Sequence, residues 1–194
     1  MPLPTFTTLP EVHDYIAGNL RRAVKDGKHA WHWPVLSTAS ECRVVVLRGV
    51  RIEPARWRFY TDARSEKMTY IDAGARVGAC FYHPRHRTQL RLHGDPKVVT
   101  SEEERRKLWS EQSARSKRSY ATRHAPGTLL ETAGTGLSDR WEAGQPSVEE
   151  DEAAFAHFVV VDVLVDGIDF LQLGEDGQRR ARGGRLEELR WVVP

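Results

Sequence analysis

The sequence is poor in cysteine, with two cysteines among its 194 residues. Cys42 and Cys80 lie far apart, and each stands within or beside an apolar strand pattern. We therefore expect two buried free thiols rather than a disulfide. The eight histidines form no cluster with cysteine at the spacing of a zinc site, and we expect no metal centre.

The sequence also lacks a long hydrophobic run. The most apolar stretch, Phe158 to Val165, is interrupted by Asp162 and is too short to span a bilayer. The first residues, Met1 to Phe6, have neither the basic start nor the apolar stretch of an export signal. These absences predict a cytoplasmic protein without a membrane partner.

An excess of charge of one sign is lacking as well, because the formal net charge is only +2. This charge is too small to indicate a nucleic-acid-binding protein, although it would not repel a phosphorylated ligand. A hydrophobic share of 40% in 194 residues is ordinary for one globular domain. We find no internal repeat, no glycine-rich nucleotide loop after a strand and no nucleophile elbow. We predict a single domain that spans residues 1–194.

Four segments begin with the capping signals of helices. Thr8 to Glu11 is a capping box followed by apolar residues at helical spacing, which predicts an amphipathic helix to about Lys25. Ser65 should begin a short helix that ends near Gly74. The other two predicted helices begin after Ser101 and after Ser147.

The remaining apolar segments favour β-strands. Asp166-Gly167 is typical of a tight hairpin turn between two of them. In another, Leu90 and Leu92 should share the face that packs on the core. The pattern predicts a mainly β, α+β fold, a mostly antiparallel barrel with helices at its edges. The predicted strands are residues 29–37, 43–50, 56–61, 77–82, 89–93, 158–165, 168–173 and 186–193.

An ordered set of cations, hydroxyls and apolar residues indicates an anion site beside a flat apolar wall. Arg43 and Arg48 enclose the run 44–47, Tyr60 and Thr61 end a later strand, and Ser65-Glu66-Lys67 begins a helix. Guanidinium and ammonium groups with free backbone donors bind phosphate. Strict alternation puts the two arginines on opposite faces of one strand, so both reach one ligand only if the strand bulges or the ligand sits at its end.

This order of segments resembles the pyridoxamine 5'-phosphate oxidase-like family of flavin mononucleotide (FMN)-binding split barrels. In that family an R-x-V-x-L-K strand, an F-Y-T-N strand end, an S-R-K helix start and an R-Q-V-R-x-x-G strand follow one another. The corresponding segments here are residues 43–48, 59–62, 65–67 and 88–94. The match is good over about residues 29–100 and looser in the C-terminal strands.

The resemblance implies an FMN-binding split β-barrel, antiparallel with peripheral helices, in a homodimer that holds FMN at the subunit interface. It implies that Arg43, Tyr60, Thr61 and Lys67 contact the phosphate and ribityl chain, and that Gln89 contacts the polar edge of the ring. Arg180 would make the last flavin contact, with Arg182 as a competitor in register. The full set of implied FMN-contacting residues is Arg43, Val44, Val45, Val46, Arg48, Tyr60, Thr61, Ser65, Lys67, Gln89 and Arg180.

The resemblance also implies an FMN-dependent oxidoreductase that acts on a small molecule, without a catalytic residue that we can assign. Three departures set this chain apart from true pyridoxamine phosphate oxidases, whose activity we do not expect here. Glu66 replaces an arginine, Leu171 replaces a tryptophan that packs by the flavin, and 176–178 replaces the Arg-Leu-His that binds the substrate phosphate.

Two other functions remain open at this point. A flavin-binding carrier or sensor would have the same cofactor residues without turnover. A nucleic-acid-binding protein could use the basic segment 115–123, in which an aromatic residue lies among cations, although the acidic run 102–104 nearby argues against it. The long Gly- and Pro-containing excursion 126–146 is expected to be functional, mobile or a partner contact.

Overall fold

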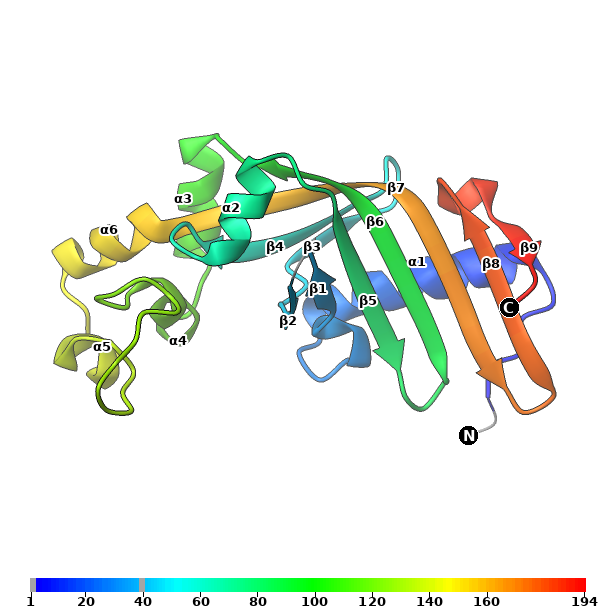
Figure 1. The fold of residues 1–194 in the computed structure, drawn as a ribbon, viewed down its shortest axis with the longest axis horizontal. Coiled ribbons are helices and arrows are strands. Elements are labelled where there is room, and N and C mark those ends of the chain that lie inside the picture. Colours follow the sequence, from blue (N-terminus) through cyan, green and yellow to red (C-terminus); the bar gives the residue numbers. More distant parts are fainter. Residues whose placement is uncertain (1–2, 39–40) are drawn as a thin grey trace. The chain divides into compact units, whose positions relative to one another are not determined.

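The computed structural model describes residues 3–38 and 41–194, so Met1 and Pro2 of the N-terminal stretch lie outside the described residues. The chain divides into two compact units (Figure 1). The first unit comprises Met1–Phe59, Gly74–Lys97 and Asp162–Pro194. The second unit comprises Tyr60–Ala73 and Val98–Val161.

The first unit is built on an antiparallel sheet. Its strands follow one another in the order β2-β1-β5-β6-β7-β4-β3, and β8 pairs with β7 and β9. Among the described residues the end strands β2 and β3 do not pair, so the sheet stays open. The predicted mainly β, antiparallel fold with peripheral helices is confirmed, although the sheet of the predicted split barrel is not closed. The strands are β1 Val35–Ser37, β2 Cys42–Val44, β3 Gly49–Arg51, β4 Arg56–Asp62, β5 Val77–His83, β6 Thr88–Val98, β7 Phe158–Gly174, β8 Gly177–Gly183 and β9 Arg190–Val192.

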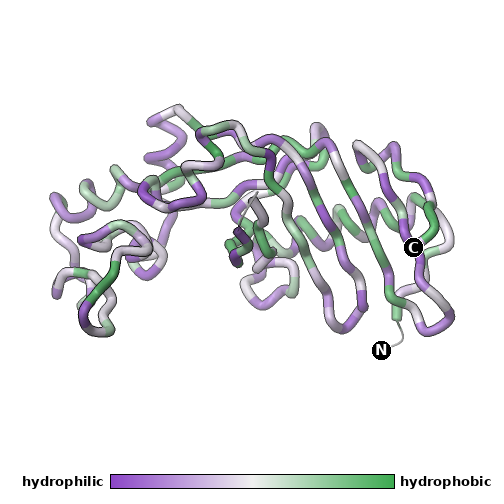
Figure 2. Tube along the Cα trace, viewed as in Figure 1, coloured by the Kyte–Doolittle hydropathy of each residue, from purple (hydrophilic) through white to green (hydrophobic). Residues whose placement is uncertain are grey.

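Helix α1, Leu9–Lys25, covers one face of these strands (Figure 1). The predicted capping box is present, because the Thr8 hydroxyl accepts from the Glu11 backbone N–H and the Glu11 carboxylate accepts from the Thr8 N–H at 2.9 Å. Val12 and Ile16 are fully buried on the inner side of the helix. Figure 2 shows hydrophobic and hydrophilic residues interleaved along the chain, as a helix with one buried face requires.

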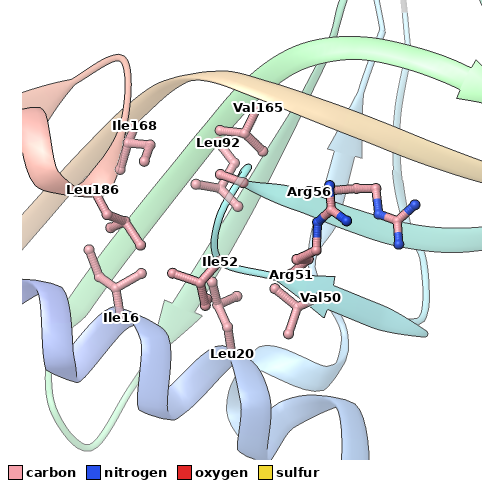
Figure 3. A pocket seen from close by; sticks show the side chains of 11 residues that line it. Ile16, Leu20, Val50, Arg51, Ile52, Arg56, Leu92, Val165, Ile168 and Leu186 are labelled. Carbon is pink, nitrogen blue, oxygen red and sulfur yellow. The ribbon is translucent and has the colours of Figure 1, made fainter.

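The core under α1 encloses a small apolar cavity of about 20 Å³ (Figure 3). Ile16 and Leu20 approach it from the helix, and Leu92, Val165 and Ile168 approach it from the sheet. A volume of this size corresponds to about one water molecule, and apart from Arg51 and Arg56 the side chains that line the cavity are apolar. The cavity is therefore a packing gap and not a cofactor site.

The second unit is mainly helical. Its aromatic core gathers Trp109, Tyr120, Trp141, Phe155 and Phe158. Four of its helices begin after a serine whose hydroxyl accepts a backbone N–H, which satisfies one of the free donors of each first turn. The elements are α2 Glu66–Asp72, α3 Glu102–Ser110, α4 Ala114–Lys117, η2 Arg118–Tyr120, α5 Asp139–Ala143 and α6 Val148–His157.

The predicted hairpin at Asp166-Gly167 is wrong, because β7 runs without interruption from Phe158 to Gly174. The chain turns instead at residues 175–176, before Gly177, whose φ is +112°. A Cβ on Gly167 would lie 3.3 Å from His93 Cβ, and one on Gly94 would lie 2.0 Å from Leu164 O. These glycines therefore serve the close approach of β6 and β7 rather than a turn.

The predicted strand over residues 43–50 is divided in two. Arg43 and Val44 pair with β1, whereas the Arg48 N–H donates to Arg58 O in β4 at 2.8 Å. Between these strands the Val45 N–H donates to Pro34 O and the Leu47 N–H to His32 O. The chain thus changes partner strands between Arg43 and Arg48. The two arginines do not lie on one continuous strand, so strict alternation does not fix them on opposite faces.

Two further expectations need correction. The predicted strand 29–37 begins as the 3-10 turn η1, Ala30–His32, because the His29 side chain accepts from the Trp31 N–H at 3.1 Å. Both cysteines are free, as expected, but Cys42 is exposed and Cys80 is half-buried. Cys42 is exposed because it lies on the same face of β2 as Val44, which is 59% exposed. Among the described helices, none combines the length and apolarity needed to cross a bilayer.

Candidate cofactor site

Three predicted residues of the second unit meet in one buried cluster. The Lys67 ammonium donates to Thr61 Oγ1 at 2.8 Å and to Ser65 Oγ at 3.0 Å, and the two hydroxyl oxygens are 3.1 Å apart. All three residues are less than a tenth exposed. Thr61 lies at the end of β4, and Ser65 and Lys67 lie in the turn and first residues of α2. We call these three residues the Lys67 cluster.

Glu66 lies between two members of the cluster but points away from it. Its side chain is exposed, whereas Ser65 and Lys67 are buried. Residues 65, 66 and 67 project in different directions because successive residues of a helix are rotated by about 100°. The acidic residue that replaces the family's arginine therefore does not place its charge among the buried groups.

Arg64, the residue before Ser65, is held in place within the same unit. Its guanidinium forms two bonds with the Asp62 carboxylate, at 3.0 and 2.7 Å, and donates to Thr122 O at 2.9 Å. Asp62 also accepts from the Arg64 backbone N–H at 2.8 Å. This bidentate pair holds the turn between β4 and α2, and with it the position of Ser65.

Tyr60 takes a structural position. Its ring packs edge-on against Phe158, with centroids 4.9 Å apart, at the border of the aromatic core of the second unit. An aromatic residue at this position is therefore compatible both with contact to a cofactor and with packing in the core. Both uses favour the same residue type, because an aromatic ring buries a large apolar area.

In the first unit, Arg43 lies on the end strand β2 beside Glu41. Its guanidinium contacts the Glu41 carboxylate, and its side chain remains 36% exposed. Arg43 pairs with Leu36 of β1, a residue that is buried on the core side of the sheet. Val44 points to the opposite face and is 59% exposed. Val45 is buried and Val46 and Arg48 are half-buried.

The face that Val44 shares extends across four strands. Val44 pairs with Val35, Val35 pairs with Cys80, and Cys80 pairs with Arg91. Paired residues lie on one face of a sheet, and so do residues two apart on one strand. Gln89 is therefore on this face as well, half-buried and opposite Tyr82. Leu90 and Leu92 face the core as predicted, at 0% and 4% exposure.

Arg180 belongs to an ion-pair cluster around Asp169. The Arg180 guanidinium donates to the Asp169 carboxylate at 3.0 and 2.6 Å, Arg91 donates to it at 2.5 Å, and Arg182 lies 3.3 Å away. The Asp169 side chain is only 5% exposed. Burial raises the pKa of this carboxyl group, but Arg180 and Arg91 lower it more, so its pKa lies below the usual value.

The carboxylate partners of Arg180 and Arg43, which are Asp169 and Glu41, are not among the residues predicted from the sequence. A signal for Asp169 was available, because a carboxylate inside an apolar strand is almost never buried without a partner. The same signal applies to Asp162, which is 5% exposed and binds Arg56 and Arg58 at 2.6 to 2.8 Å. The identity of each partner depends on strand register, which the sequence does not state.

The segment in place of the family's substrate triplet forms the β7–β8 hairpin. Asp176 lies in the turn, and Gly177 pairs with Gly174. Leu171, in place of the flavin-packing tryptophan, pairs with Arg180 and is half-buried. Next to it, Gln172 is 1% exposed and its Nε2 donates to Pro4 O, while its Oε1 has no hydrogen-bond partner among the described residues.

The basic segment 115–123 bonds inward at two of its cations. Lys117 Nζ lies 2.9 Å from the Asp151 carboxylate and 4.6 Å from the centroid of the Trp109 ring. Arg118 donates to the backbone carbonyls of residues 141 and 142. These cations support the helical unit and do not form a continuous track for a nucleic-acid backbone. Within residues 3–38 and 41–194, no group of His, Cys, Asp or Glu is arranged to hold a metal ion.

Part of the chain matches a known protein family. Residues 19–100 match a family model described as pyridoxamine 5'-phosphate oxidase, FMN-binding domain. No curated protein matches the chain.

Two solved structures match over nearly the whole chain. A pyridoxamine 5'-phosphate oxidase-related, FMN binding protein from Nostoc punctiforme has a TM-score of 0.70 and 23% identity, covering 93% of this chain and 95% of its own. PhzG from Burkholderia lata, solved in complex with tetrahydrophenazine-1-carboxylic acid, has a TM-score of 0.70 and 15% identity, covering 98% of each chain. At such identities the likeness shows a common fold.

Proposed function

We propose, because residues 19–100 match the FMN-binding domain model of pyridoxamine 5'-phosphate oxidase, that this chain binds FMN and acts as an oxidoreductase on a small molecule. The family resemblance carried by the segments 43–48, 59–62, 65–67 and 88–94 is confirmed by that match, and the matching domain is an FMN-binding domain. The activity and the residues that serve it are our proposal.

The Lys67 cluster is the observation that carries the proposal. Lys67 Nζ gives hydrogens to both hydroxyl oxygens. Of Thr61 and Ser65, only one hydroxyl can donate to the other, so the second keeps a hydrogen for a further acceptor. An ammonium and a hydroxyl donor held rigidly in a buried position suit a phosphate group, which offers several acceptor oxygens and a double negative charge.

The first unit supplies residues that suit the ring. Gln89, Val44 and Arg91 share one face of the sheet, and Asp169 draws Arg91 and Arg180 together. An apolar residue, an amide and fixed guanidinium groups on one face match the flat surface and polar edge of a flavin. We assign Gln89 to the polar edge of the ring and Arg180 to the last flavin contact.

In this proposal FMN, when bound, supplies the hydride or electron transfer. The residues of the chain anchor the phosphate, orient the ring and donate hydrogen bonds to it. No side chain stands out as a general base. Because Asp176 and Gly177 occupy the hairpin where the family has its substrate-binding cations, we propose a substrate other than pyridoxamine phosphate.

We also propose a homodimer that holds FMN at its interface. Val35, Val44 and Tyr82 are 38%, 59% and 47% exposed, and the strand registers put them on the same sheet face as Gln89. A contiguous apolar patch of this kind marks an interaction surface in soluble proteins. A second copy over this face would cover the patch and enclose a ring that lies on it.

The first experiment is the visible absorption spectrum of the freshly purified protein, with the mass of any released chromophore. We expect a flavin spectrum and the mass of FMN. The substitution Arg43→Ala should then weaken binding, because it removes a guanidinium that the resemblance assigns to the phosphate. The matched control is Arg21→Ala on the exposed side of α1. A colourless protein that does not take up added FMN would contradict the proposal.

A carrier or sensor without turnover is the second candidate. It is favoured by Leu171 and by the turn residue Gly177, which remove the family's flavin-packing and substrate-binding side chains. Reduction of the bound flavin by NAD(P)H followed by its reoxidation distinguishes the two functions. An enzyme completes repeated cycles, whereas a carrier or sensor keeps FMN bound without steady consumption of the reductant.

A further inference from the structure

The second unit contains a cleft that the flavin proposal does not use. Its volume is about 380 Å³, within the range of small-molecule sites. The lining comes from η2, the segment after it, α5 and α6, which lie together at one end of the unit (Figure 1). The apolar part of the lining is Tyr120, Ala121, Trp141, Ala153 and Ala154.

The long excursion 126–146 forms one wall of this cleft and is fixed in place. The Arg123 N–H donates to Gly136 O at 2.8 Å, which closes the loop on itself. Thr135 Oγ1 donates to the Glu142 carboxylate at 2.5 Å, and Arg118 donates to Trp141 O at 2.8 Å. A long loop that is held in this way presents a defined surface, so the excursion has a structural reason to carry a binding site.

One acidic side chain, Glu150, and one basic side chain, Arg123, complete the lining. The Glu150 carboxylate accepts from Ser138 Oγ at 2.5 Å and from the Ser147 N–H at 2.8 Å, and both bonds lower its pKa, so the group stays ionised. Arg123 is exposed, and no described residue forms an ion pair with its side chain. The cleft therefore offers one anion and one cation beside an apolar wall.

His157 adds a hydrogen-bond acceptor. Its Nδ1 lies 3.0 Å from Tyr120 O. A carbonyl oxygen can only accept, so Nδ1 carries the proton and Nε2 of the neutral ring is left as an acceptor. The side chain lines the cleft together with Glu150 and Arg123. A ligand with an anionic group for the arginine and a donor for the histidine or the glutamate would satisfy all three.

We propose that this cleft binds a small aromatic carboxylate that also carries an amino or hydroxyl donor. The carboxylate would pair with Arg123, the donor would reach Glu150 or His157, and the ring would lie against Trp141 and the alanines of α6. Ala153 and Ala154 leave the room that the ring needs. The site lies entirely within the second unit and shares no residue with the Lys67 cluster.

The test uses the full chain saturated with FMN and isothermal titration with 2-aminobenzoate. We expect saturable binding with one site per chain. Benzoate lacks the donor and should bind about tenfold more weakly, and aniline lacks the carboxylate and should bind more weakly still. Absence of saturable binding of 2-aminobenzoate and of 2-hydroxybenzoate at millimolar concentration overturns the proposal.

Two pairs of variants locate the site. Ala153→Leu fills the cleft from an exposed position and should abolish binding, while Ala156→Leu, exposed on the same helix but outside the lining, should leave it unchanged. Arg123→Gln should weaken binding about tenfold, and the exposed Arg115→Gln should have no effect. Binding that survives both Ala153→Leu and Arg123→Gln overturns the assignment. Binding that is lost when FMN is removed would instead place the ligand at the flavin.

Discussion

The cations marked by the family pattern have different partners in the two units. In the second unit, the Lys67 ammonium bonds to the hydroxyls of Thr61 and Ser65. In the first unit, Arg180 forms two bonds with the Asp169 carboxylate, and Arg43 contacts the Glu41 carboxylate. The partners of Lys67 thus include two neutral hydroxyls, whereas Arg180 and Arg43 each contact a carboxylate.

The partner of each cation affects how strongly that cation can attract a ligand. An arginine that is held by a carboxylate is fixed in direction, but part of its attraction for a second anion is cancelled. At the Lys67 cluster, one of the two hydroxyls keeps a hydrogen for a further acceptor, so a neutral donor lies beside the ammonium. We therefore propose that the Lys67 ammonium and this hydroxyl donor anchor the phosphate together, and that Arg180, held in direction by Asp169, contributes mainly to orientation.

The largest expected effect follows from removing the ammonium. Lys67→Met keeps a long apolar stem and removes the charge, so the dissociation constant of FMN should rise about 100-fold through loss of charge-assisted bonds. Quenching of FMN fluorescence on titration measures this change. The exposed Lys97→Met is the control and should bind FMN like the original chain. An unchanged dissociation constant in Lys67→Met would show that the phosphate lies elsewhere.

The ion pairs between Asp169 and its arginines are tested by Asp169→Asn. Three arginines then lose a buried counter-charge, and the free energy of unfolding should fall by about 2 kcal/mol, toward the low end for broken buried ion pairs because the arginines are partly exposed. Urea denaturation measures the change. Asp95→Asn, in an exposed pair with Arg76, should cost at most about 0.5 kcal/mol. Equal losses of unfolding free energy in Asp169→Asn and Asp95→Asn would show that the buried and the exposed ion pairs contribute equally to stability.

The same variant has a pH signature. The folded-state pKa of Asp169 lies below its usual value, so its contribution to stability is present above the unfolded pKa and is lost as the pH falls through the folded pKa. The original chain should therefore lose more stability than Asp169→Asn when the pH falls from neutral to below 4. Parallel pH profiles of the two proteins would argue against an ionised Asp169 in the folded chain.

The parts of this molecule that could be predicted from sequence are those set by local interactions. The capping box at Thr8, the strand that ends at Thr61 and the cluster of Ser65 with Lys67 all involve residues within a few positions of one another. Helical and strand periodicity then show which of their neighbours are buried. For this reason the three residues that meet in the Lys67 cluster could be singled out from the sequence.

The parts that could not be predicted depend on contacts distant in the sequence. Asp166-Gly167 has the composition of a turn, but the approach of β6 at Gly94 makes it part of a long strand. The pairing of Arg91 with Asp169 spans 78 positions and depends on strand register. A shift of register by one residue would move each side chain to the other face, and no local pattern reports which register is adopted.

The smallest expected effect concerns His83 and His86, two histidines whose pKa values are lowered in the folded chain. The imidazoles of His83 and His86 are stacked with centroids 3.8 Å apart, and His86 Nδ1 lies 2.8 Å from the Tyr15 hydroxyl. Burial, followed by the charges of His86, His29 and Arg85, lowers the pKa of His83 to about 4. The unfolded chain then binds more protons than the folded chain between about pH 6.5 and 4.

Stability should therefore fall as the pH is lowered through that window. We expect a loss of about 1 kcal/mol from His83, less than the full shift implies, because the ring is partly exposed and solvent screens it. His83→Gln should reduce the difference between urea midpoints at pH 7 and pH 5, and the exposed His124→Gln should not. If His83→Gln keeps the full difference between the midpoints, a group other than His83 accounts for the acid sensitivity.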